Sequence, residues 1–331
     1  MLCESFSQHE TGPHCLLEPP SRKTRHGVEH LHMTIAQSLT DSSAEARRRL
    51  VGGTAPMLLH PRPHPPTHWR QAKLIVTRGC WARCEFCHFS RFVPLSQGKA
   101  VAPVLGIPDA VAELQRAPAF DGVKVVTGLS FQAPLEYFTH LIQALREATG
   151  QPVQAFSAVE VDHLARRLAS SAREILTEWK RQRLDRLGPG GAELLVPSVR
   201  PSLARYRISV ERWLEIHRVA HSLGLRTAAG LMFDARTTAA QIIEHLNRLR
   251  EVCEGLDHIE LQPLESAQTA LTPIRPPRLD QLLRVAAATK TLWPDLPLHI
   301  HLRSIASADA EILLADAGVD RIIETVLEVQ P

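Results

Sequence analysis

A chain of 331 residues can form one large barrel or two ordinary domains, and its 44% hydrophobic content can bury a sizeable core. Its 38 basic and 35 acidic residues nearly balance and form no block of one sign, which excludes the basic footprint of a nucleic-acid-binding protein. No apolar run approaches the roughly 20 residues of a membrane span, and the first residues lack the apolar core of a signal peptide.

Residues 1–70 carry little periodic pattern, and prolines alternate with histidines near their end, at Pro61, Pro63, Pro65, His60, His64 and His68. Such a segment is extended and partly solvated, and its histidines are better explained as loop residues than as a metal-binding tract. A helix is expected only at 43–50, and Met33 is a second possible start. The sequence predicts an irregular extension over 1–70 and one catalytic domain over 71–331.

Three cysteines follow the apolar run 73–77 at the spacing C-x3-C-x2-C, namely Cys80, Cys84 and Cys87. Iron–sulfur clusters are normally held by four thiolates, so three ligands in one loop predict a [4Fe–4S] cluster with one iron open to a small molecule. A zinc site is the alternative, with His88 or Cys253 as fourth ligand, although no second C-x2-C pair exists. Because a labile cluster needs reduced thiols, we expect a cytoplasmic location.

From residue 73 onward, short apolar runs alternate with longer amphipathic ones. Strands are expected at 73–77, 122–127, 153–156, 184–187, 225–233, 258–262, 298–302 and 321–326. Helices are expected at 109–115, 135–148, 161–180 with a possible break at Ser170-Ser171, 210–223, 240–252, 279–291 and 308–317. Eight such alternations predict the α/β fold of a parallel (β/α)8 barrel of the TIM type.

In such a barrel, functional residues lie beyond the carboxyl ends of the strands. The cysteine loop follows the first expected strand. Polar or glycine-rich groups follow the next five, at 127–130, 157–160, 190–193, 234–236 and 263–265. The motif and the expected fold therefore predict one site at this rim.

The cysteine loop, with the aromatic Phe86 before its last cysteine, resembles the signature of the radical S-adenosylmethionine (radical SAM) enzymes. Further segments resemble one subgroup, which holds the two radical enzymes of the futalosine route to menaquinone and the two that build the deazaflavin of coenzyme F420. These segments are 85–91, 135–138, 155–163, 190–195 and 213–227. The segment Ala155-Phe156-Ser157-Ala158-Val159-Glu160 most resembles aminofutalosine synthase.

The resemblance implies a [4Fe–4S] cluster and S-adenosyl-L-methionine (SAM) as cofactors, with a small-molecule substrate and an electron donor such as flavodoxin or ferredoxin. In aminofutalosine synthase, a 5′-deoxyadenosyl radical adds to the double bond of 3-[(1-carboxyvinyl)oxy]benzoate. Rearrangement and decarboxylation then give the aminofutalosine product. The resemblance thus implies a radical SAM transferase of menaquinone synthesis.

Roles for single residues follow from the same resemblance. Gly128 matches a glycine that lets the backbone approach the methionine amino group, and Glu193 and Ser157 are candidates for the SAM ribose. Glu193 could instead be a solvated carboxylate at a helix start, and Ser157 an ordinary helix cap. Because arginine pairs well with carboxylates, Arg91 and Arg303 are candidates for the two substrate carboxylates.

The chain departs from the subgroup at several positions. After the fifth expected strand, Asp234 and Ala235 stand where the family has glycine and histidine, and Thr127 replaces the first of two glycines after the second. The cyclic dehypoxanthinyl futalosine synthase, a deazaflavin-synthase-like enzyme, and a divergent relative with another substrate therefore stay open. A non-catalytic zinc-binding barrel is the alternative from a different class.

Overall fold

The computed structural model describes residues 65–82, 84–87, 89, 103–130, 132–264, 275–301 and 308–331, with the side chains of 308–310 and 312 left aside. The helix expected at 43–50 and the candidates Arg91 and Arg303 lie outside these ranges. Most of the expected extension does so too. The division at residue 70 therefore stays a proposal.

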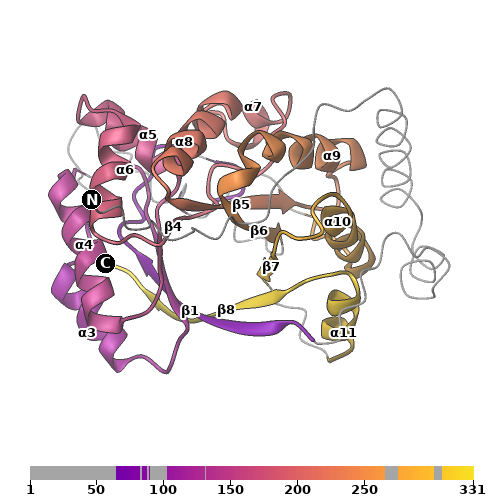
Figure 1. The fold of residues 1–331 in the computed structure, drawn as a ribbon, viewed down its shortest axis with the longest axis horizontal. Coiled ribbons are helices and arrows are strands. Elements are labelled where there is room, and N and C mark those ends of the chain that lie inside the picture. The colour runs from indigo at the N-terminus through magenta and orange to yellow at the C-terminus, as the bar shows by residue number, and fades with distance from the viewer. Residues whose placement is uncertain are drawn as a thin grey trace, which may run out of the picture.

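The described strands form one closed sheet in which each strand runs parallel to its neighbours and the last strand pairs with the first (Figure 1). They are β1 (Thr67–Ile75), β2 (Gly122–Val126), β3 (Val153–Ala155), β4 (Arg186–Leu187), β5 (Arg226–Phe233), β6 (Leu256–Pro263), β7 (Leu298–His301) and β8 (Arg321–Val329). The prediction of a parallel eight-stranded TIM-type barrel is confirmed.

Helices connect the strands and pack on the outside of the barrel, whereas β1 and β8 run along the lower edge of the view in Figure 1. They are α3 (Ile107–Arg116), α4 (Leu135–Thr149), α5 (Ala158–Arg167), α6 (Ala172–Arg181), α7 (Arg200–Leu203), α8 (Val210–Ser222), α9 (Ala239–Arg248), the 3-10 helix η2 (Leu249–Gly255), α10 (Leu279–Leu292) and α11 (Ala308–Asp316). Within the described ranges, no helix is both long and apolar enough to cross a bilayer.

Two helices differ from the sequence prediction. The helix expected at 240–252 ends as α9 at Arg248 and continues as the 3-10 helix η2, which is kinked at Val252 with φ −136°. The short helix α7 was not predicted, since its four residues are too few to show a helical period. The expected break at Ser170-Ser171 is present, and α5 and α6 are separate helices.

The apolar core lies between the sheet and the surrounding helices. Leu74, Val125 and Ile259 are almost completely buried there. Because successive side chains of a strand point to opposite faces, the alternate residues of the same strands face the barrel interior. Many of these inward residues are polar, such as Lys124 and Glu260.

We expect Ser171→Ala to lower the free energy of unfolding by about 1 kcal/mol. The Ser171 hydroxyl accepts a hydrogen bond from the Glu174 amide at 3.2 Å and begins α6 as a capping box. Urea unfolding followed by circular dichroism measures the change. Ser202→Ala is the control, because that exposed hydroxyl donates only to the carbonyl of Val199. Equal unfolding midpoints for the two variants would contradict the prediction.

Candidate functional site

The three cysteines lie in the loop that leaves the carboxyl end of β1. Cys80 and Cys84 are buried and Cys87 is half-buried, and in the described part of the chain these cysteines are thiols rather than members of disulfides. The Cys87 amide donates to the Cys84 carbonyl at 3.1 Å, so the second and third cysteines share one tight turn. A single short loop thus presents all three thiols.

Two other segments fix this loop against the barrel. The Glu85 amide donates to the Leu203 carbonyl at 3.0 Å, which attaches the loop to α7. The Ser130 amide, just beyond β2, donates to the Gly79 carbonyl at 2.9 Å. The first predicted rim segment therefore lies directly beside the cysteines.

Gly128 is packed against the start of the cysteine loop. Its amide donates to the Thr77 carbonyl at 2.7 Å, and a Cβ at this position would lie 2.1 Å from the Gly79 carbonyl oxygen. No side chain fits without moving the backbone. Contact with the cysteine loop is thus sufficient to explain why a glycine is needed at this position. The role of Gly128 toward the methionine group of SAM stays a prediction.

Burial opposes ionisation of Cys84 and Cys87. It is the main reason that the pKa of Cys84 is raised to about 12, and Glu193, Cys87 and Cys80 act in the same direction. Burial likewise raises the pKa of Cys87. The positive charge of Arg207 acts in the opposite direction on both thiols. A metal cluster bound by Cys84 and Cys87 would have to overcome this preference, because thiolates are the metal ligands.

Arg207 lies between the cysteine loop and Glu193. Its guanidinium is 5.4 Å from the centre of the Phe86 ring and forms an ion pair with the Glu193 carboxylate. Glu193 also accepts a hydrogen bond from the Gly191 amide at 3.0 Å, and Arg200 lies 3.7 Å from its second oxygen. Glu193 is buried and lies outside any helix, so it is not a solvated carboxylate at a helix start.

Two buried polar atoms here lack a hydrogen-bond partner among the described residues, Glu193 Oε2 and Arg207 Nε. Buried polar groups are normally satisfied, so an unpaired acceptor and an unpaired donor on one ion pair need an explanation. A polar ligand with both hydroxyl and carboxylate groups would satisfy both atoms. SAM carries these groups, and the residues present fit it.

Ser157 is the N-cap of α5. Its hydroxyl accepts from the Val159 amide at 3.3 Å and donates to the Glu160 carboxylate. Burial raises the pKa of Glu160, although the Ser157 hydroxyl and Arg207 act against that increase. The structure thus supplies the capping role considered for Ser157, and a contact with the SAM ribose stays a prediction.

No three His, Cys, Asp or Glu side chains converge closely enough to hold a single metal ion in the described part of the chain. A zinc ion needs four such ligands around one centre. A cubane cluster instead places each thiolate on a different iron, so its ligands lie further apart. The [4Fe–4S] cluster at the three cysteines stays a prediction, as does the zinc alternative.

After β5, the Asp234 side chain bonds to residues of the turn in which it lies. Its carboxylate accepts from the Arg236 amide at 2.9 Å and pairs with the Arg236 guanidinium at 2.6 Å. Asp234, which differs from the glycine expected by resemblance, therefore stabilises this turn through its bonds to Arg236.

Sequence reasoning missed Arg207 and the polar residues inside the barrel, among them Lys124, Glu260 and His301. For the barrel interior a signal existed, because polar residues alternate with apolar ones in β6 and β7. Arg207 lies in an irregular segment between α7 and α8, where no periodicity marks it.

No family model matches the chain. Comparison with solved structures places its fold among known enzyme barrels. Methylornithine synthase superposes with a TM-score of 0.67 at 14% identity, covering 88% of this chain and 81% of that one. The FeFe-hydrogenase maturase of Carboxydothermus hydrogenoformans gives 0.65 at 14% identity, covering 90% and 71%. The chain therefore shares the fold of these two enzymes over most of its length.

Curated relatives are found in the subgroup that the motifs resemble. Aminodeoxyfutalosine synthase of Thermus thermophilus is 32% identical over 179 residues, covering 53% of this chain and 47% of that protein. The 5-amino-6-(D-ribitylamino)uracil–L-tyrosine 4-hydroxyphenyl transferase of Methanosphaerula palustris is 30% identical over 212 residues, covering 64% and 55%. Cyclic dehypoxanthine futalosine synthase of Streptomyces coelicolor is 29% identical over 209 residues, covering 62% and 50%.

The chain spans about half the length of these curated relatives. The predicted resemblance to the futalosine and deazaflavin subgroup of radical SAM enzymes is confirmed. These relatives act on different substrates, as their names state. The comparisons consequently support similarity to this subgroup and do not distinguish among its reactions.

We expect Gly128→Ala to reduce the iron and sulfide content of the anaerobically reconstituted chain several-fold, because the new Cβ displaces the Gly79 carbonyl and with it the cysteine loop. Chemical iron and sulfide analysis measures the loss. Gly150→Ala is the matched control: it strains a left-handed position at φ +65° by about 1 kcal/mol, yet lies in open space after α4. A full iron content in Gly128→Ala would contradict the packing argument.

Proposed function

We propose that this chain is a radical SAM enzyme whose Cys80, Cys84 and Cys87 hold a [4Fe–4S] cluster. The observation that carries the proposal is the unpaired Glu193 Oε2 and Arg207 Nε, buried beside three thiols at the carboxyl end of a closed barrel. The cluster, when bound, supplies the electron that cleaves SAM to a 5′-deoxyadenosyl radical. The same cluster chemistry supports a reducing, cytoplasmic location.

The described residues would bind and orient SAM rather than take part in bond cleavage. Glu193 Oε2 would accept a hydrogen bond from a ribose hydroxyl, and Arg207 Nε would donate to the methionine carboxylate. Gly128 holds the segment after β2 against the start of the cysteine loop. Orientation and exclusion of water are the contributions that a protein makes to cofactor chemistry.

For the reaction, we propose transfer of the adenosyl group to 3-[(1-carboxyvinyl)oxy]benzoate to form aminofutalosine in menaquinone synthesis. Similarity to aminodeoxyfutalosine synthase supports this choice. Arg91 and Arg303 remain proposed partners for the substrate carboxylates, and flavodoxin or ferredoxin the proposed electron donor. Similarity to the uracil–tyrosine transferase supports a deazaflavin-synthase-like reaction as the second candidate.

We expect anaerobic incubation with SAM, reductant and 3-[(1-carboxyvinyl)oxy]benzoate to yield aminofutalosine, detected by mass spectrometry. The transferase consumes the adenosyl group into its product, whereas the cyclase of the same route releases 5′-deoxyadenosine. A parallel incubation with tyrosine and 5-amino-6-(D-ribitylamino)uracil tests the second candidate. Failure of the first mixture with an intact cluster would contradict the proposed reaction.

We expect Cys80→Ser, Cys84→Ser and Cys87→Ser each to abolish the visible absorption of the reconstituted cluster, because thiolates are its ligands. Cys253→Ser is the control, since Cys253 lies in η2, away from the cysteine loop in sequence and fold. Optical absorption with iron analysis measures the effect. Retention of the band in all three loop variants would exclude this cluster site.

A further inference from the structure

The interior of the barrel carries a polar cluster that the cofactor site does not use. It consists of inward-facing residues from four strands, which meet around one carboxylate, that of Glu260 on β6. The side chains that contact it come from β2, β3, β6 and β7, and they are Lys124, Gln154, His258, Gln262 and His301. Contacts between β2 and β6 cross the barrel, so these side chains lie in its lumen.

Both carboxylate oxygens of Glu260 have partners within the protein. Its Oε2 accepts from Lys124 Nζ at 3.0 Å and lies 2.7 Å from His301 Nε2. Its Oε1 accepts from Gln154 Nε2 at 2.9 Å and lies 3.2 Å from His258 Nε2. Burial alone would raise the pKa of Glu260, but Lys124 and His301 hold it well below the usual value. This carboxylate is therefore a permanent acceptor that positions its donors.

Lys124 is the member with hydrogen-bonding capacity left over. An ammonium group has three N–H donors, and its described partner is the single carboxylate of Glu260. The side chain is 12% exposed and that of His301 is 24% exposed, whereas Glu260 is 1% exposed. Because both contact the same oxygen and His301 ends β7, the ammonium lies toward the carboxyl end of the lumen.

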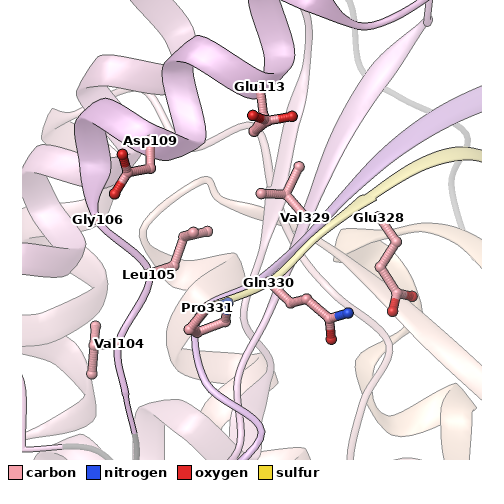
Figure 2. Close-up of a pocket in the computed structure, with 9 residues that line it drawn as sticks. All are labelled: Val104, Leu105, Gly106, Asp109, Glu113, Glu328, Val329, Gln330 and Pro331. Atoms are coloured by element: carbon pink, nitrogen blue, oxygen red, sulfur yellow. The ribbon is translucent and has the colours of Figure 1, made fainter.

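Two other hollows suit an aromatic carboxylate less well. The hollow of about 430 Å³ between α3 and β8 is lined by Asp109, Glu113 and Glu328, so it repels anions (Figure 2). The cavity at the amino end of the barrel is only about 30 Å³, room for water and not for a benzene ring. The cluster around Glu260 differs from both hollows because it presents a cation, the Lys124 ammonium.

We propose that the Lys124 ammonium, held by Glu260 beside His301, binds a carboxylate of the substrate inside the barrel. The inference deepens the proposed function, on which it rests for the carboxylate chemistry of the substrate. Lys124 keeps its bond to Glu260 and donates a second charge-assisted hydrogen bond to the ligand. Glu260 is a positioning residue, which fixes the ammonium without touching the substrate.

The test is equilibrium binding to the reconstituted full chain, measured by anaerobic isothermal titration calorimetry. The probes are 3-[(1-carboxyvinyl)oxy]benzoate, benzene-1,3-dicarboxylate and the uncharged benzene-1,3-dicarboxamide. We expect Lys124→Met to weaken binding of both carboxylates about 10- to 100-fold, the value of a hydrogen bond to a charged group. Binding of the diamide should change little. Lys180→Met removes the same charge from the outer helix α6 and should leave all affinities unchanged.

Lys124→Met leaves the buried Glu260 without its cation, which could impair folding. The double variant Lys124→Met/Glu260→Gln leaves no unpaired charge and should bind the carboxylates as weakly as the single variant. Carboxylate affinity equal to wild type in either variant would overturn the inference, as would absence of carboxylate binding by the wild-type chain. Weaker binding in both variants without aminofutalosine formation by the wild type would uphold it and refute the proposed reaction alone.

Discussion

The pairing of β1 with β8 is the interaction on which the rest of the structure depends. This parallel ladder runs from Thr67 opposite Arg321 to Leu74 opposite Val329 and closes the sheet. Closure brings the carboxyl ends of all strands to one rim. The cysteine loop after β1, Gly128 after β2 and Glu193 after β4 are thereby collected around one point, although they are far apart in sequence. An open sheet would spread the same segments along an edge.

Two buried ion pairs lie at the two proposed binding sites of the molecule. Arg207 and Glu193 lie at the rim beside the thiols, and Lys124 and Glu260 lie inside the lumen. Each pair keeps its charges neutralised, yet Glu193, Arg207 and Lys124 retain unused hydrogen-bonding capacity among the described residues. Burying charge is costly unless it is paired, so such pairs are weak evidence for added stability. In the proposed function, these pairs hold polar groups in position for a ligand.

The sequence predicted the parts of the structure that depend on local pattern. The strands, the capped break before Ala172 and the three cysteines follow from periodicity, from cap chemistry and from ligand spacing. Gly128 was identified by resemblance, and its physical reason, contact with the Gly79 carbonyl, became visible only in three dimensions. Arg207 and Lys124 could not be found in this way. Their partners are distant in sequence. The apolar neighbours of Lys124 in β2 do not reveal that it contacts Glu260, and no periodicity marks the segment of Arg207.

In this barrel, the side chains that supply hydrophobic burial lie on a different face of the sheet from the polar side chains of the interior. Apolar burial lies outside the sheet, in side chains such as Leu74 and Ile259 that pack under the helices. Inward positions such as Gln154 and Gln262 contribute little to that hydrophobic layer. An exchange at an inward position therefore leaves the outer hydrophobic layer intact, provided that the buried carboxylate of Glu260 keeps its donors. A barrel built this way can change the chemistry of its interior over evolutionary time as long as these charges remain paired.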